Sequence, residues 1–304
     1  MKPFLLAVMG PTGSGKSSLA EHLADQTGAQ LINADAFMVY RGFDIGTNKP
    51  SDPYRYRLLD LKAPTEDFGV GEYVVLAQEA IWEAWRSGRS AIVVGGTGLY
   101  IRALFEQWQD LSPLPGPRLR AQLEARLSQE GLTALVAELR GVAPEVAAKT
   151  DLQNPVRVRR ALERILEPSE PIKLELPPCP RLKIGLVPSV SDLDQALAER
   201  TAKLLASGWL EEVQLLASQG VRDDSPAMRA IGYRTLLRVL GGDCELSEAL
   251  SRITLETRQY AKRQRTWLRS EPNLRQFHSF DGVAVRDEVT RILSSPLEDE
   301  EQSK

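Results

Sequence analysis

A glycine-rich segment near the amino terminus carries the residues that hold a polyphosphate. Its pattern is G-x-x-x-x-G-K-S, running from Gly10 to Ser17. Glycines let backbone N–H groups close around phosphate oxygens, a lysine can reach the terminal phosphate, and a hydroxyl can bind Mg²⁺. We therefore predict Ser17 as a metal ligand and the whole loop as the phosphate site. The loop consists of Gly10, Pro11, Thr12, Gly13, Ser14, Gly15, Lys16 and Ser17.

Two other segments could bring polar groups to the same place. Asp35 follows the apolar run Gln30–Ala34, and Thr97 stands among glycines after the run Ser90–Val94. In an open parallel sheet, ligands bind beyond the carboxyl ends of the strands. Asp35 could then act as a general base or bind Mg²⁺ through water, or it could simply be a solvated or capping carboxylate. Thr97 could orient a ligand, cap a helix, or do both.

The elements expected around these residues follow the order of a parallel α/β sheet. Buried strands and amphipathic helices alternate, which predicts a P-loop NTPase-like core. No apolar strand ends in the aspartate that conventional ATP hydrolysis requires, which argues against motor proteins and GTPases. The expected elements are strands at Phe4–Met9, Gln30–Ala34 and Ser90–Val94, with helices at Ser17–Gln26 and Val74–Arg86.

From about Leu111 the sequence changes character, because several prolines interrupt it. Helical periodicity then predicts a helical insertion, and a Pro- and Glu-rich loop follows at Glu167–Pro180. We divide the chain into a first core part (1–110), the insertion (111–180), a core completion with C-terminal helices (181–285), and a terminal helix end with an acidic, disordered tail (286–304). The further expected elements are helices at 118–129, 132–139 and 156–166, a strand at Leu182–Val187, and long helices at Asp192–Ser218 and Leu246–Ser270.

Composition limits the class of protein. The chain has 304 residues, a net charge of −3, two cysteines and two histidines. So few cysteines and histidines exclude a Cys/His zinc finger and argue against a disulfide framework. No run of about 18 apolar residues could cross a membrane. The phosphate loop begins too early to leave room for a signal peptide, so we expect a cytoplasmic protein.

Basic residues are concentrated on one predicted helix. Arg258, Lys262, Arg265 and Arg269 recur at offsets of 4, 3 and 4, which makes a cationic stripe on one helix face. A second basic cluster lies at 157–164. Such stripes contact nucleic-acid phosphates, although many are only solvated helix faces. The negative net charge argues mildly against nucleic acid, but part of it lies in the tail Leu297–Glu301.

From about residue 5 to residue 270, the chain resembles the bacterial tRNA dimethylallyltransferases, also called tRNA isopentenyltransferases. The Asp44–Thr47 segment and the Tyr260–Trp267 segment are the most specific matches. Besides the phosphate loop, the matching segments are Ala34–Asp35, Val39–Gly42, Asp44–Thr47, Lys49–Pro50, Gly95–Tyr100, Asn154–Pro155, Arg157, Arg160–Glu163, Gly208, Glu212–Val213, Ala230–Tyr233, Arg258–Gln264 and Thr266–Trp267.

The resemblance implies a reaction and a set of site residues. A dimethylallyl group would pass from dimethylallyl diphosphate to the exocyclic amine of the tRNA adenosine 3′-adjacent to the anticodon, with Mg²⁺ as cofactor. Asp35 would be the general base, Thr97 would orient the amine, and Arg120 and Arg200 would reach the diphosphate. We expect a monomer. The implied tRNA contacts are Asp35, Ala36, Phe37, Met38, Arg159, Arg160, Ala161, Leu162, Glu163, Arg258, Lys262 and Arg265.

Some positions depart from the family pattern, and other functions remain open. Ala36 and Met38 stand where the family usually has Ser and Gln, so two contacts to the flipped base would be missing. The alternatives are a small-molecule or nucleotide kinase and a regulatory nucleotide-binding module. The cationic stripe and the missing strand-end aspartate favour the transferase over both.

Overall fold

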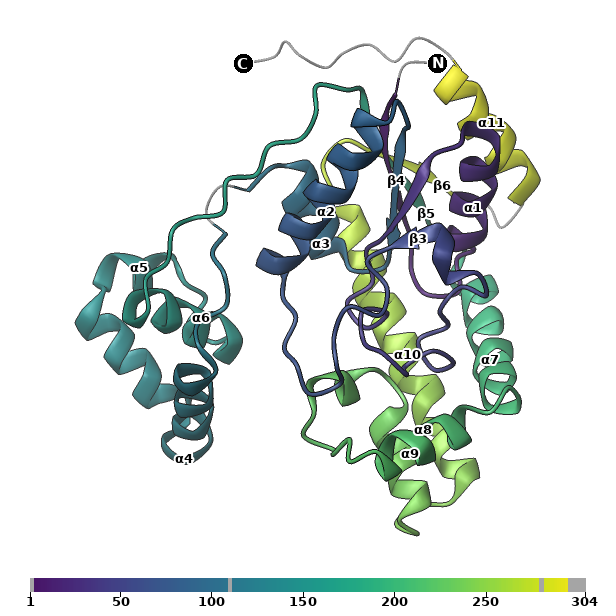
Figure 1. The fold of residues 1–304 in the computed structure, drawn as a ribbon. Helices are drawn as coiled ribbons and strands as arrows, with labels where there is room; N and C mark the ends of the chain where they lie inside the picture. The colour runs from purple at the N-terminus through teal and green to yellow at the C-terminus, as the bar shows by residue number, and fades with distance from the viewer. Residues whose placement is uncertain (1–2, 109–110, 279–281, 295–304) are drawn as a thin grey trace. The chain divides into compact units, whose positions relative to one another are not determined.

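The computed structural model describes residues 3–108, 111–278 and 282–294 (Figure 1). The predicted acidic tail Leu297–Glu301 lies outside these residues. The chain forms two compact units. The first consists of Met1–Phe68, Leu76–Gln107 and Glu175–Lys304, and the second of Gly69–Val75 and Trp108–Leu174. The predicted insertion at 111–180 overlaps the second unit but extends beyond it, because residues 175–180 belong to the first unit. The second unit also includes residues 69–75, which the prediction placed in the core.

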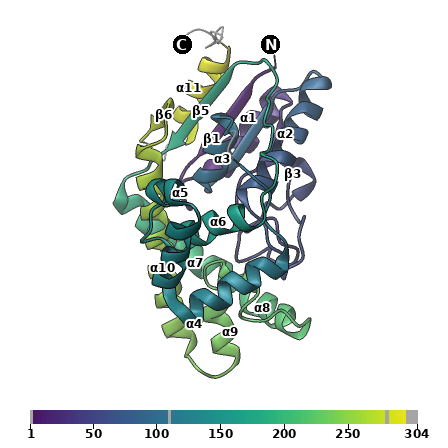
Figure 2. The same cartoon turned by 90° about the vertical axis from the view of Figure 1, so that its left-hand side faces the viewer.

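The first unit is built on a six-stranded sheet in the order β3-β2-β4-β1-β5-β6, in which every pairing is parallel. Figure 2 shows β6, β5 and β1 side by side. This arrangement confirms the predicted P-loop-like α/β core. The strands are β1 (Leu5–Met9), β2 (Gln30–Asn33), β3 (Tyr56–Arg57), β4 (Ala91–Gly95), β5 (Arg181–Leu186) and β6 (Leu274–Phe277).

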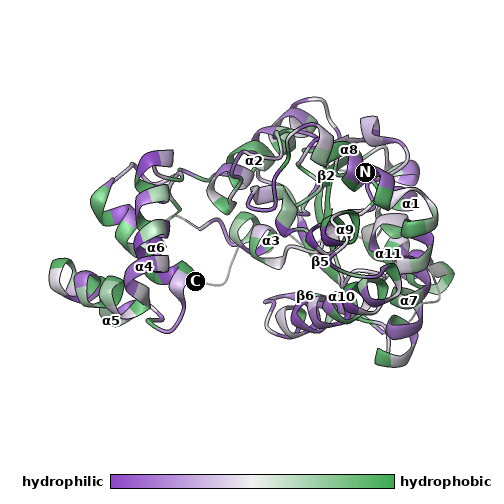
Figure 3. Ribbon diagram, turned by 90° about the horizontal axis from the view of Figure 1, so that it is seen from below, coloured by the Kyte–Doolittle hydropathy of each residue, from purple (hydrophilic) through white to green (hydrophobic). Residues whose placement is uncertain are grey.

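The register of the sheet brings three loops to one edge. Met9 at the end of β1 pairs with Gly95 at the end of β4, and Asn33 of β2 pairs with Val94. The loops that follow these strands therefore leave the sheet together, as expected for a ligand site at the carboxyl ends of parallel strands. Each of β1 and β4 is buried along its whole length and consists almost entirely of hydrophobic residues. Figure 3 shows hydrophobic residues, in green, in the interior of the first unit around β2.

Helices cover both faces of this sheet. On one face, α1 (Lys16–Thr27) and α11 (Gly282–Ser294) share a core in which Leu19 and Leu23 meet Val285 and Val289. The helices α2 (Val70–Arg86) and α3 (Gly98–Phe105) lie on the other side (Figure 1).

A group of helices completes the first unit beyond the carboxyl edge of the sheet. The predicted single helix Asp192–Ser218 is wrong, because the chain turns at Gly208 with φ 98°, a left-handed conformation that ends one helix before the next begins. These helices are α7 (Val190–Ala206), α8 (Trp209–Ser218), α9 (Tyr233–Leu240) and α10 (Leu246–Arg269), with the 3₁₀ turn η2 (Pro226–Arg229) before α9. A second 3₁₀ turn, η1 (Pro53–Arg55), directly precedes β3.

The second unit is helical and has its own core. Its helices are α4 (Pro117–Val142), α5 (Pro144–Lys149) and α6 (Pro155–Leu166). The backbone of α4 is interrupted at Gly131, where φ is 80°. Leu123, Leu135 and Leu162 are buried at the centre of the unit. The unit thus buries its apolar residues without using the sheet.

Candidate active site

The phosphate loop joins β1 to α1 in a conformation that requires glycine. Gly13 and Gly15 have φ values of 82° and 80°, which residues other than glycine rarely adopt. A Cβ at Gly10 would overlap the Ser14 hydroxyl. Helix α1 has no acidic residue in its first turn and no side-chain cap. Its first N–H groups are therefore left for an anion.

A cavity of about 390 Å³ lies beside this loop. Its lining combines charged residues with apolar side chains, so it can hold a ligand with both an anionic and an apolar part. It is lined by Thr12, Gly13, Gly15, Lys16, Ser17, Ser18, Asp35, Phe37, Met38, Gly46, Thr47, Asn48, Arg200, Thr201, Leu204, Trp209, Arg229, Ala230, Ile231, Ile253, Thr257, Tyr260, Arg263 and Gln264.

Two cations that line the cavity, Lys16 and Arg200, are partly buried and form no salt bridge to a described carboxylate. Burial lowers the pKa of Lys16 to about 8; the charge of Asp35 opposes this shift, and that of Arg200 adds to it. Arg200, from α7, donates to the hydroxyl of Thr12 in the phosphate loop, and burial lowers its pKa too. Buried charges are normally paired, so this arrangement favours an anionic ligand.

Asp35 and Thr97 lie in adjacent loops at the ends of β2 and β4. Asp35 lines the cavity, and its Oδ1 accepts from the backbone N–H of Phe37 at 2.9 Å. Its other carboxylate oxygen makes no hydrogen bond to a described residue, which leaves it available to a substrate. The Thr97 hydroxyl accepts from the N–H of Ala36 at 3.1 Å. A Cβ at Gly95 would overlap Ala34, so glycine permits this close approach of the two loops.

Thr97 stands at the N-cap position of α3, but its side chain makes no capping hydrogen bond. It is also not among the side chains that line the cavity. The alternative that its side chain caps the helix is therefore wrong. Instead, its hydroxyl holds the backbone beside Asp35, and its role in orienting an amine stays a prediction.

Helix α10 brings Tyr260, Arg263 and Gln264 to the cavity, and sequence reasoning gave none of them a role. Burial and then the charge of Asp35 raise the pKa of Tyr260 well above its ordinary value, with partial offsets from Thr97 and Gln264. Its phenol therefore stays protonated. The signal that could have found these residues was their spacing, since Tyr260 and Gln264 are one helical turn apart.

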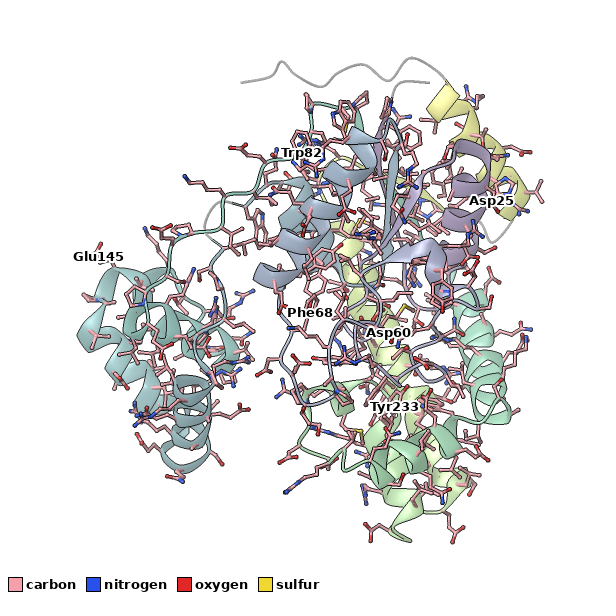
Figure 4. The ribbon with its side chains drawn as sticks, in the orientation of Figure 1. Asp25, Asp60, Phe68, Trp82, Glu145 and Tyr233 are labelled. Carbon is pink, nitrogen blue, oxygen red and sulfur yellow. The ribbon has the colours of Figure 1, made fainter. Side chains whose placement is uncertain are left out.

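The loop at Asp44–Thr47 is held by a single carboxylate. Glu212 of α8 accepts from the N–H groups of Asp44 at 2.8 Å and Ile45 at 2.7 Å, and from the hydroxyl of Tyr233 at 2.6 Å. Figure 4 labels Tyr233 in this part of the first unit. A Cβ at Gly46 would overlap the Trp209 indole, so only glycine fits there. This loop forms part of the cavity wall.

Comparisons with known proteins identify the family. The model of the IPP transferase family matches residues 38–271. The chain belongs to the IPP transferase family. It is similar to a tRNA dimethylallyltransferase of Thermomicrobium roseum, with 42% identity over 273 residues, covering 87% of this chain and 83% of the relative. A tRNA dimethylallyltransferase of Geobacter sulfurreducens is 39% identical over 300 residues, covering 93% and 96%.

Solved structures of transferases share the fold. The tRNA isopentenylpyrophosphate transferase of Bacillus halodurans is 31% identical, with a TM-score of 0.68, covering 96% of this chain and 97% of that one. A eukaryotic dimethylallyltransferase acting on tRNA has a TM-score of 0.73 at 22% identity, covering 98% and 81%. The resemblance seen in the sequence is confirmed.

In this family member, one carboxylate organises the arginines of the second unit. The Glu163 side chain is 2% exposed and lies 3.8 Å from Arg120, 3.4 Å from Arg159 and 3.1 Å from Arg160. Arg160 also donates to the carbonyl of Ser112 at 2.7 Å. The contact of Arg120 with a diphosphate and those of Arg159 and Arg160 with tRNA stay predictions.

Three predicted tRNA contacts in the second unit have buried side chains. Ala161, Leu162 and Glu163 are each no more than 2% exposed. The structure gives these side chains a packing role, because they lie between the helices of the unit. Contact of this segment with tRNA stays a prediction.

The transferase carries the predicted cationic stripe on the surface of α10. Arg258 and Lys262 are exposed, whereas Arg265 is half-buried and its Nε is buried with no hydrogen-bond partner in the described residues. Arg258 pairs with Asp194 of α7 at 3.5 Å, an acid that is distant in the sequence. Lys262 pairs with no described carboxylate. No helix among the described residues is long and apolar enough to span a membrane.

Proposed function

We propose that this IPP transferase moves a dimethylallyl group from dimethylallyl diphosphate to the exocyclic amine of the tRNA adenosine 3′-adjacent to the anticodon, releasing diphosphate. The named relatives, tRNA dimethylallyltransferases, support the enzyme class. The observation that carries the proposal is one cavity that combines a phosphate loop, an apolar wall and an available carboxylate oxygen. We propose a monomer that acts in the cytoplasm, where its tRNA substrate is found.

The cavity suits both parts of the donor. The diphosphate would accept from the N–H groups at the start of α1 and from the side chains of Lys16 and Arg200. Leu204, Ile231 and Ile253 line the same cavity and are suited to the prenyl tail. Each CH₂ buried there contributes about 0.8 kcal/mol to binding. A purine would need its own recognition groups, so ATP would be at most a weak competitor.

The polar residues fit the transfer step. As the amine nitrogen forms a bond to the first prenyl carbon, the bond from that carbon to the diphosphate oxygen breaks. The free carboxylate oxygen of Asp35 would take the amine proton. Lys16, Arg200 and the helix N-terminus would stabilise the charge that develops on the leaving diphosphate. The phosphate loop would thus bind a leaving group and not a phosphoryl group in transfer.

The residues fit a magnesium ion held together with the substrate. The Ser17 hydroxyl lines the cavity and has no hydrogen-bond partner in the described residues. No group of three or more His, Cys, Asp or Glu side chains in the described part of the chain could hold a metal by itself. Mg²⁺ commonly binds through few protein groups, with phosphate oxygens and water completing its shell. When bound, it would neutralise charge on the diphosphate.

Product analysis with separate donors tests the function. Unmodified tRNA and Mg²⁺ are supplied with either dimethylallyl diphosphate or ATP, and the RNA is digested and analysed by mass. We expect prenylated adenosine from the first donor only, and its loss in Lys16→Ala. Arg89→Ala, which changes an exposed residue before β4 and thus at the other edge of the sheet, should retain activity. A phosphorylated product from ATP, without prenylated adenosine, would replace the proposal with a kinase.

A further inference from the structure

The side chain of Gln264 joins the two glycine-rich loops of the site. Its Oε1 accepts from the backbone N–H of Thr12 at 2.8 Å, and its Nε2 donates to the carbonyl of Gly96 at 3.0 Å. The residue is 7% exposed. A Cβ at Gly96 would overlap the Gln264 amide, so the contact is close. One side chain from α10 thereby links the loop after β1 to the loop after β4.

The chemistry of the two partners defines what this position requires. The Thr12 N–H can only donate and the Gly96 carbonyl can only accept, so the amide has one possible orientation. A carboxylate could accept from Thr12 but would repel the carbonyl oxygen. An apolar side chain of the same length would leave both backbone groups unpaired. A glutamine, or a protonated carboxyl group, satisfies both.

Both contacts lie beside residues of the proposed chemistry. The Thr12 hydroxyl accepts a hydrogen bond from the Arg200 guanidinium. Gln264 and Arg200 therefore hold the phosphate loop at the same residue. Gly96 precedes Thr97, whose hydroxyl is bonded to the backbone next to Asp35. The amide therefore connects the backbone that cradles the diphosphate with the backbone that carries the base.

Helix α10 is itself fixed to the loop after β4 one turn beyond Gln264. A Cβ at Gly98 would overlap the Trp267 ring, and the Arg102 guanidinium lies 4.2 Å from the centre of that ring. Arg102 also bonds Glu271 at 2.8 Å. Gln264 is therefore presented from a helix that cannot shift freely along the loop.

We propose that Gln264 is a positioning residue that locks the phosphate loop to the Gly95–Tyr100 loop and so sets the reacting carbon of the donor against the amine and its base. The inference rests on the proposed function. Because a displacement of about 1 Å in a catalytic arrangement can reduce the rate by ~10²-fold, loss of this link should lower kcat strongly. The KM for tRNA should change little, since the amide is bonded to backbone within the site.

The test uses two variants of similar size, Gln264→Glu and Gln264→Met, with prenyl transfer measured from pH 5.5 to 9. We expect Gln264→Met to lose ~10²-fold in kcat at every pH. Gln264→Glu should be equally slow at high pH and recover as pH falls, because a protonated carboxyl accepts from Thr12 and donates to Gly96. Gln276→Glu, at an exposed glutamine of β6, is the matched control and should behave like the wild type.

Other titrating groups face the same cavity, so the readout is the ratio of the Gln264→Glu rate to the Gln264→Met rate. Those groups are Lys16, Asp35, Arg200, Arg229, Tyr260 and Arg263, and they are common to both variants. A ratio that stays flat across the pH range would overturn the proposal. So would a Gln264→Met variant with the wild-type kcat.

A second measurement separates this inference from the proposed function. Inorganic diphosphate binding to the full chain without tRNA reports on the phosphate site and involves no prenyl transfer. Its affinity should fall in Gln264→Met and recover at low pH in Gln264→Glu. If the wild type makes no prenylated adenosine, the function fails while this pH-dependent affinity still supports the link. Unchanged diphosphate affinity together with unchanged kcat in Gln264→Met refutes the link itself.

Discussion

Partly buried cations have different partners in the cavity of the first unit and in the helices of the second unit. In the first unit, Lys16 and Arg200 line a cavity and form no salt bridge to a described carboxylate. In the second unit, Arg120 and Arg159 are also mostly buried, with side chains 14% and 12% exposed, but they lie within 4 Å of Glu163. The resemblance assigns the same diphosphate role to Arg120 and Arg200. Arg200 lies beside the phosphate loop, where it donates to the Thr12 hydroxyl.

The difference shows how environment decides what a cation can do. A cation that already has an internal carboxylate gains less from an external anion, and separating such a pair is costly. A desolvated cation without that partner is stabilised most by a bound anion. The cavity of the first unit is therefore suited to an anion, whereas the arginines of the second unit already lie around a carboxylate of their own unit.

The largest effect on turnover should come from Asp35→Asn. Asparagine can still accept from the Phe37 N–H, so the local turn is kept, but the base is lost. Turnover should fall by ~10²–10⁴. Donor affinity should stay the same or rise, because Lys16 and Arg200 lose an opposing charge. Single-turnover kinetics with saturating tRNA and donor calorimetry check both parts, and wild-type turnover would show that Asp35 is not the base.

Glu163→Gln tests the internal pairing of the second unit. It would leave three guanidinium groups around a neutral amide, and breaking a buried ion pair costs about 3–5 kcal/mol. We expect the unfolding transition of the second unit to have its midpoint at a lower denaturant concentration than in the wild type. Glu170→Gln, at an exposed position of the same unit, is the control. Equal midpoints for the two variants would mean that Glu163 does not hold the arginines together.

The lowered pKa of Lys16 predicts a pH dependence of donor binding. Below about pH 8 the ammonium is charged in the free protein, and above it the proton is lost. A bound diphosphate favours the charged form, so binding above about pH 8 must take up a proton, and affinity should fall by up to about tenfold per pH unit. Calorimetry in buffers of different ionisation enthalpy measures this uptake. It should vanish in Lys16→Gln, and its persistence there would assign it to another group.

The smallest effect concerns the surface of α10. Replacing Arg258 and Lys262 by glutamine should weaken tRNA binding. The slope of log K against log salt should become shallower by ~0.7–0.9 for each phosphate that is no longer neutralised. Arg258 should contribute less than Lys262, because Asp194 already pairs with it. Arg86→Gln with Arg89→Gln, near the amino edge of β4, provides a matched double control. An unchanged slope in the α10 double variant would mean that these side chains are only solvated.

Sequence alone determined the phosphate loop and the core around it. The G-x-x-x-x-G-K-S pattern, the buried strands and Asp35 at a strand end are local signals, because chain geometry and glycine freedom act within a few residues. The matched segments likewise predicted the family. The sequence did not determine where every helix begins and ends. Periodicity continued from Asp192 to Ser218, although the left-handed turn at Gly208 divides that segment.

Tertiary structure alone decided which side chains share the site and how each is used. Arg200 forms a hydrogen bond with Thr12, which is 188 positions away in the sequence. Gln264 forms one with Thr12 across 252 positions. Asp194 pairs with Arg258 although no acid lies between Arg258 and Arg269 in the sequence, and the Thr97 hydroxyl accepts from the Ala36 N–H instead of capping α3. Such partners depend on which helix packs against which strand end, and spacing along one helix carries no information about the element opposite it.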